Sequence, residues 1–177
     1  MATTPIPRPA AVAVALCAAA LLAACAGASR AACPKPVPKI TDYGAVGDRK
    51  TLISAAFAKA VADLSARAPR GGAALVAPPT KWLTGPFNLT SHFTLYLDEG
   101  AEILASQDMN DCPLIAPLPS YGTGRDDPGP RYSNFIAGSY LTDVIITGNN
   151  GTISGQGQGW WDQYHAKELL FTRGYLL

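Results

Sequence analysis

A change of hydrophobic periodicity near residue 70 is the feature that most constrains the fold of this chain. Before it, apolar residues recur at helical spacing from Ile53 to Leu64, on one face of a helix expected to end near Pro69 and Gly71. After it, short apolar runs are bounded by Gly, Asn, Asp or Pro, the pattern of strands joined by turns. One helix followed by short strands argues against a doubly wound sheet and leaves a sandwich, a barrel or a β-solenoid.

The expected strands are short and either wholly apolar or alternating. They are centred on Ala73–Ala77, Phe93–Leu97, Ile103, Ile136, Val144–Ile146 and Ile153. The segment ahead of the helix, ITDYGAVGDRKT from Ile40 to Thr51, combines apolar residues with two glycines that permit tight bends. It predicts a short strand, a turn and a helix start, with Asp48 placed to accept hydrogen bonds from the first helical amides.

The first 28 residues have the composition of a secretory signal peptide. No charged residue occurs between Ala10 and Ser29, and Ala26 and Ala28 offer an A-x-A cleavage site. The stretch LAAC ending at Cys25 is also typical of a bacterial lipoprotein, and the apolar run is just long enough for a signal anchor. We predict a signal peptide over 1–28, a linker over 29–39, one β-rich domain over 40–177 and secretion to the extracellular space or cell wall.

Cysteine and sequon patterns agree with secretion. Two of the four cysteines belong to the leader, and the other two, Cys33 and Cys112, could pair in an oxidising compartment. N-glycosylation sequons begin at Asn88 and Asn150. The net charge of +1 gives no electrostatic basis for binding nucleic acid or, after leader cleavage, a membrane surface.

The acidic residues and histidines that could act in catalysis are better explained as loop, structural or surface residues. Asp126 and Asp127 form an adjacent carboxylate pair, and such pairs can shift each other's pKa, but they lie in the Pro/Gly-rich stretch YGTGRDDPGP, where a solvated loop is expected. His92 and His165 lack the cysteine or carboxylate spacing of a metal site. We interpret both histidines as structural or surface residues and predict no metal and no cofactor.

Weak candidates for substrate binding lie in the second half of the chain. Trp160 and Trp161 could stack on a sugar ring, although paired aromatic residues more often fill a hydrophobic gap. Arg125 and Arg131 could bind an anionic polymer, because guanidinium pairs well with carboxylate. The default interpretation of both side chains is solvation at the surface. The glycine-rich stretch 155–159 is interpreted as a turn in the solenoid and not as a dinucleotide loop.

Three long stretches resemble the N-terminal part of glycoside hydrolase family 28, the polygalacturonases, in a form typical of plants. They are Gly71–Asp108, Pro117–Tyr132 and Leu141–Asp162, and with the opening signature the resemblance covers about Ile40 to Leu176. It implies an all-β fold, a right-handed parallel β-helix with an N-terminal amphipathic capping helix, truncated after the first few coils. The last coil is then expected to expose its apolar interior. The resemblance also favours cleavage of the leader, a pectic polysaccharide as partner and, for a complete protein, a monomer.

The family's catalytic motifs are not found in this chain. Family 28 enzymes hydrolyse α-1,4-galacturonosidic bonds with inversion, using acids in N-T-D and D-D motifs followed by G-H-G and R-I-K motifs, and none of the four occurs in its proper setting. The resemblance therefore implies an N-terminal fragment of a polygalacturonase-like hydrolase that has no catalytic residue of its own and is inactive alone. The alternative is a non-catalytic pectin-binding or interaction module. A lyase is a third hypothesis, although no calcium-binding cluster of carboxylates is visible.

Four residues depart from the family pattern. Arg49 and Thr80 stand where glycine is usual, Cys112 occupies a place often held by tryptophan, and Gly174 replaces a proline. None is at a catalytic position. Local turn geometry is the property they affect, with Thr80 the most suspect if its turn needs a positive φ.

Overall fold

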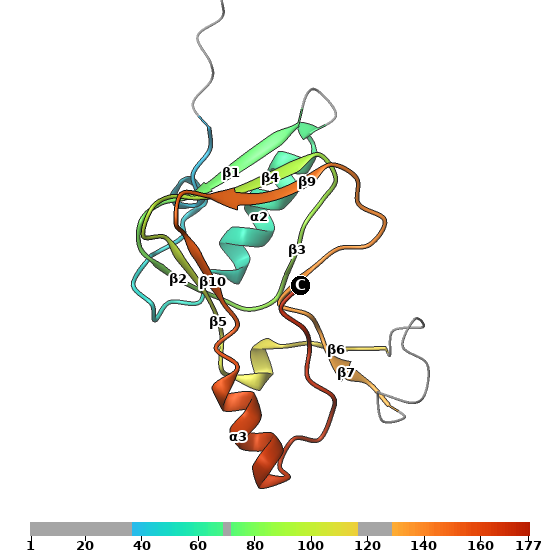
Figure 1. Cartoon of the computed structure of the whole chain (residues 1–177). Helices are drawn as coiled ribbons and strands as arrows, with labels where there is room; N and C mark the ends of the chain where they lie inside the picture. The colour runs from blue at the N-terminus through green and yellow to red at the C-terminus, as the bar shows by residue number, and fades with distance from the viewer. Residues whose placement is uncertain (1–36, 69–71, 117–128) are drawn as a thin grey trace, which may run out of the picture. The chain divides into compact units, whose positions relative to one another are not determined.

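The strands pair in parallel with strands from distant parts of the sequence (Figure 1). The computed structural model describes residues 37–68, 72–116 and 129–177. One sheet has the order β1-β4-β9, formed by Ala73–Ala77, Phe93–Leu97 and Val144–Gly148. A second has the order β10-β5-β2, formed by Thr152–Ser154, Glu102–Ala105 and Lys81–Thr84. Every pairing in these two sheets is parallel.

A third sheet closes the coils. It pairs β3 (Phe87–Asn88) with β8 (Ile136–Ala137), and the last residues extend it, since the amide of Ile136 donates to the carbonyl oxygen of Leu176 at 3.0 Å. The first coil therefore consists of β1, β2 and β3, the second of β4, β5 and β8, and the third of β9, β10 and residues 175–177. This arrangement confirms the predicted parallel β-helix.

Two further strands lie outside the coils. β6 (Leu114–Ile115) and β7 (Arg131–Tyr132) pair antiparallel and belong to an insertion between β5 and β8. Figure 1 shows this pair extending away from the three sheets. The insertion also contains the 3₁₀ helix η4 (Met109–Asp111), and it brings polar residues to the edge of the second coil.

Apolar side chains stack from coil to coil in the interior. Leu75, Leu95 and Ile146 align in one row, and Trp82, Ile103 and Ile153 in another. Burial falls along the first row, because Leu75 and Leu95 are 0% exposed whereas Ile146 is 37% exposed. Fully burying such a side chain contributes about 1.5–3 kcal/mol, so the first two coils hold most of the hydrophobic stabilisation. The expectation that the last coil exposes its apolar interior is confirmed.

The helix α2 (Ser54–Ser65) covers the open end of the first coil. Its buried residues, Ala56, Phe57, Ala60 and Leu64, all belong to the face that the helical spacing predicted, and Val61 of that face is partly buried. Phe57 stacks on Phe87 of β3 with ring centroids 4.3 Å apart. Because a solenoid needs a cap over its first apolar cross-section, this packing explains why the helix precedes the strands. The predicted N-terminal capping helix is confirmed.

The segment before α2 differs from its prediction in two ways. Ile40–Tyr43 forms a 3₁₀ helix, η2, and not a strand, because Gly44 at φ 88° closes the turn with a 3.0 Å hydrogen bond from its amide to the carbonyl oxygen of Thr41. Asp48 does not cap α2. Its carboxylate accepts hydrogen bonds from the amides of Lys50 and Thr51, since a short side chain reaches only two or three residues ahead.

A left-handed residue precedes each strand of the first sheet. Gly72 (φ 86°), His92 (φ 56°) and Asp143 (φ 57°) occupy equivalent corners of successive coils, one residue before β1, β4 and β9. The exposed imidazole of His92 lies 3.3 Å from the Asp143 carboxylate of the next coil. The corners therefore stack as regularly as the strands.

A second helix, α3 (Gln158–Ala166), follows β10. The interpretation of residues 155–159 as a turn is wrong from Gln158 onward, because the helix begins there with Gly157 as its N-cap. None of the residues of α3 is buried. A helix that packs no apolar face into a core needs no apolar residues at helical spacing, so its sequence shows no such pattern. No helix in the part of the chain that the structure describes is long and apolar enough to span a bilayer.

Candidate functional site

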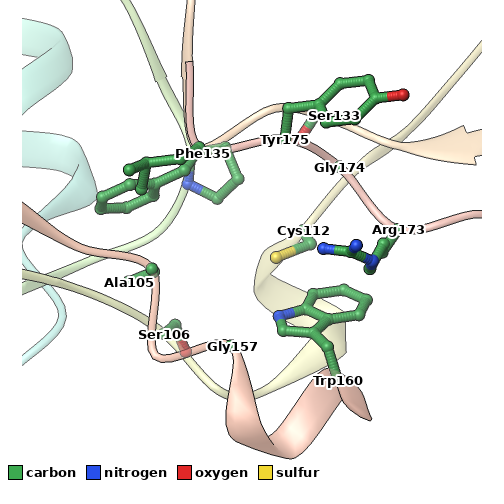
Figure 2. A pocket seen from close by; sticks show the side chains of 13 residues that line it. Ala105, Ser106, Cys112, Ser133, Phe135, Gly157, Trp160, Arg173, Gly174 and Tyr175 are labelled. Carbon is green, nitrogen blue, oxygen red and sulfur yellow. The ribbon is translucent and has the colours of Figure 1, made fainter. Parts of the chain in front are cut away.

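A cavity of about 200 Å³ lies where the second coil, the insertion and the C-terminal segment meet (Figure 2). It is bounded by the end of β5, the residue after η4, the approach to β8, the start of α3 and residues 173–176. Its aromatic walls are Phe135, Trp160 and Tyr175, and its polar side chains include Ser106, Ser133 and Arg173. Aromatic walls with a few polar groups are the usual lining of a ligand site.

Hydrogen bonds to the insertion hold the floor of the cavity. The buried Ser106 hydroxyl donates to a carboxylate oxygen of Asp111, and the amide of Ser106 donates to the carbonyl oxygen of Thr84 at 2.8 Å. Asp108 begins η4 by accepting a 2.9 Å hydrogen bond from the amide of Asn110. The orientation of Ser106 is therefore set by residues that lie behind the cavity wall.

Cys112 contributes a neutral thiol to the same wall. Burial, together with smaller effects of the Asp111 and Asp108 carboxylates, raises its pKa to about 11. The thiol therefore stays protonated at neutral pH and is a poor nucleophile. Cys112 forms no disulfide within the described residues, and Cys33, its predicted partner, lies outside them.

The C-terminal segment reaches the cavity because residue 174 is a glycine. A Cβ at Gly174 would overlap the carbonyl oxygen of Ser133. Next to this contact the amide of Tyr175 donates to Asn134 Oδ1 at 3.1 Å. Proline, which is usual here in the family, carries the Cβ that this approach excludes, so the glycine permits the observed close packing.

Arg173 is placed by the aromatic side chains of α3. Its Cζ atom lies 4.7 Å from the ring centroid of Trp161, and the ring of His165 stacks on Trp161 at 6.0 Å. The guanidinium thus covers one face of Trp161, which is the surface a sugar ring would need for stacking. Trp160 lines the cavity and packs edge-on against Tyr132 at 4.9 Å. Of the two tryptophans, Trp160 is therefore the one available to a bound molecule.

Arg131 is not at the surface. Its side chain is 1% exposed, its Cζ lies 4.8 Å from the ring centroid of Tyr175, and it donates to Asn134 Oδ1 at 3.3 Å. The predicted solvation of Arg131 at the surface is therefore wrong. Its predicted contact with an anionic polymer is wrong as well. Arg131 is buried because Tyr175 of the C-terminal segment, more than 40 residues later in the sequence, packs over it.

Several sequence candidates lie outside the described residues. They are Arg125, Asp126, Asp127, the leader 1–28 and all of the linker 29–39 except its last three residues. The side chains of Asn88 and Asn150 are exposed, as acceptors of N-linked glycans must be. Sequence reasoning missed Arg173, because nothing in FTRGY indicates that it lines a cavity.

The described side chains that line the cavity have the chemistry of a binding site. No acidic residue is among the described residues that line it, whereas an inverting glycosidase needs two carboxyl groups on opposite sides of the bond. Within 37–68, 72–116 and 129–177, no three His, Cys, Asp or Glu side chains come together as a metal site would require. The cavity therefore offers a cation, aromatic rings and hydroxyl groups.

Comparison with known proteins points to one group of enzymes. No family model matches the chain. The curated "Probable polygalacturonase" of Vitis vinifera is 55% identical over 138 residues, which are 78% of this chain and 28% of that protein. The chain thus spans 28% of the length of this relative.

Two solved structures share the fold. The family 28 exopolygalacturonase of Yersinia enterocolitica matches with a TM-score of 0.53 and 25% identity, over 63% of this chain and 19% of that one. A hyperthermoactive exopolygalacturonase of Thermotoga maritima matches with a TM-score of 0.57 and 27% identity, over 79% and 29%. Sequence and structure together confirm that this chain resembles the polygalacturonases of glycoside hydrolase family 28 and has their right-handed parallel β-helix.

Proposed function

We propose that this chain is part of a polygalacturonase-like glycoside hydrolase that acts on pectic polysaccharide in cell-wall carbohydrate metabolism. The observation that carries the proposal is the 55% identity to a protein named as a polygalacturonase, over most of this chain. Two exopolygalacturonases with the same coil architecture support it. The reaction proposed is inverting hydrolysis of α-1,4-galacturonosidic bonds.

The described residues contribute a cap, coils and a cavity to that function. Inverting hydrolysis needs one carboxylic acid to protonate the leaving oxygen and one carboxylate to activate water. The cavity contains neither group. We therefore expect the 177-residue chain alone to release no reducing ends from polygalacturonate.

Secretion to the extracellular space or cell wall belongs to the same proposal. The leader over 1–28, which carries no charge from Ala10 onward, and the two exposed sequon asparagines support it, as does a plant relative named as a polygalacturonase. The leader would be removed during export, leaving the linker 29–39 ahead of the capped β-helix.

A chimera tests the enzymatic assignment. The aligned 138 residues of the Vitis vinifera protein would be replaced by the matching residues of this chain, and reducing ends released from polygalacturonate would be measured. If the parent protein is active, we expect the chimera to hydrolyse polygalacturonate, with inversion visible in the NMR spectrum of the first product. A folded chimera without activity beside an active parent would contradict the proposal, and turnover by this chain alone would contradict its expected inactivity.

A non-catalytic pectin-binding module is the second candidate. The cavity favours it, because Arg173 and Trp160 provide a cation and an aromatic wall without an acid. Retention of the chain on immobilised pectate but not on a neutral galactan would support this candidate. It would be excluded if the chain failed to bind pectate at low salt.

A further inference from the structure

The cavity of Figure 2 combines one positive charge with an aromatic wall, which is the chemistry of a site for an acidic sugar. We propose that it binds one uronic acid unit, with Arg173 paired to the carboxylate and Trp160 against the ring. The choice of galacturonate as the uronic acid rests on the proposed function. Arg173 is then the residue that distinguishes a free carboxylate from its methyl ester.

The size of the cavity suits a single ring. Its volume is about 200 Å³. Pockets for drug-sized ligands measure about 300–1,000 Å³, so an oligosaccharide would place one unit inside and leave its neighbours at the surface. The cavity is therefore large enough to discriminate one sugar unit and too small to enclose a chain.

Among the described residues that line the cavity, Arg173 is the one that carries a charge. Figure 2 shows its guanidinium end directed toward the side on which Cys112 and Trp160 lie. Arg173 takes part in none of the ion pairs formed within the described part of the chain. A guanidinium without an acidic partner can pair with a carboxylate through two parallel hydrogen bonds.

The guanidinium is also held in place before any ligand arrives. Its cation–π contact with Trp161, at 4.7 Å, restricts the side chain, and Gly174 fixes the backbone against Ser133. Immobilising a long side chain on binding is costly, so an arginine that is already oriented binds more tightly than a mobile one. Trp161 thus acts on the ligand through Arg173.

The neighbouring groups are compatible with an anion. Asp111, the neighbour of Cys112 in sequence, is hydrogen-bonded to the Ser106 hydroxyl and is not among the described residues that line the cavity. Burial keeps the Cys112 thiol protonated, so it adds no negative charge. Trp160 offers an apolar surface of the kind on which sugar rings pack.

Binding measurements on the full chain test the site. Isothermal titration would compare α-1,4-trigalacturonate with its methyl ester. We expect at least tenfold tighter binding of the acid. Arg173→Gln should bring the two ligands within twofold of each other, and Arg173→Lys, which keeps the charge but not the fork, should leave an intermediate preference. The indole N–H signal of Trp160, assigned with Trp160→Phe, should shift on binding.

Arg67→Gln is the matched control. Arg67 is an exposed arginine that follows α2, does not line the cavity and pairs with Asp63 at 2.7 Å, so its loss should leave both affinities unchanged. Equal binding of acid and ester, an acid preference that survives in Arg173→Gln, or no binding of either ligand would overturn the proposal.

The outcomes separate this site from the proposed function. An active chimera together with Arg173-independent binding would remove the site and leave the hydrolase assignment. An inactive chimera together with Arg173-dependent binding of trigalacturonate would leave a uronate site on a chain that is not part of a hydrolase.

Discussion

Thr80 Oγ1 donates a 2.6 Å hydrogen bond to the carbonyl oxygen of Gly47, and the methyl group of Thr80 occupies the space that a Cβ on Gly47 would need. Gly47→Ala should therefore destabilise the fold by about 1–3 kcal/mol, the usual cost of overpacking. The urea midpoint of unfolding checks this. In the double variant with Thr80→Gly most of the loss should be recovered, and additive losses would show that the two residues do not compete for space.

Arg49 has a left-handed backbone at φ 64°, at a position where the family usually has glycine. Replacing it with glycine removes the clash between Cβ and the backbone, so Arg49→Gly should stabilise the chain by about 0.5–1 kcal/mol. Arg49→Ala loses the same charge but keeps the Cβ, and it should gain nothing. If both variants were equally stabilising, charge and not backbone strain would be the cause.

The Asp48 carboxylate, in the turn before α2, should make the stability of the fold depend on pH. Hydrogen bonds from the amides of Thr51 and Lys50, and from the Thr51 hydroxyl, lower its pKa from 3.8 to about 2. A lowered folded-state pKa means that its stabilisation is present above about pH 4 and is lost as the pH falls toward 2. The difference in urea midpoint between the wild type and Asp48→Asn should shrink over this range. A constant difference would show that ionisation of Asp48 does not matter.

Both exposed sequons should carry glycans when the chain is secreted from a eukaryotic host. Removing N-linked glycans enzymatically should then lower the mass by two glycans. Asn88→Gln removes the first sequon, and Thr152→Ala removes the second without touching Asn150, whose left-handed φ of 59° suits asparagine. Each variant should lose one glycan. An unmodified wild type would argue against passage through the secretory pathway.

The sequence predicted those elements whose side chains divide cleanly between interior and surface. In β4 the residues Phe93, Leu95 and Leu97 are buried and alternate with half-exposed neighbours, so the strand was visible as a period of two. The buried face of α2 was visible in the same way at helical spacing. The helix α3 buries no residue, and no apolar period could reveal it.

The candidate site depends on contacts between distant segments, which explains why the sequence did not predict it. Trp160 was a candidate from its residue type alone, but its neighbour Trp161 is covered by Arg173. The residue type of Arg131 suits an anionic polymer, yet Tyr175 packs over it. Contacts such as Arg173 with Trp161 and Arg131 with Tyr175 depend on how distant segments are brought together by the coils. Local composition does not contain that information.

The fall in burial from Leu75 and Leu95 to Ile146 has a dynamic consequence. In a stacked repeat each layer is stabilised mainly by its neighbours, so opening should begin at the least covered layer and proceed inward. Amide protons of β9 should then exchange with deuterium well before those of β1, which the helical cap protects. Local unfolding would then start at the third coil, and the capped first coil would be the last to open.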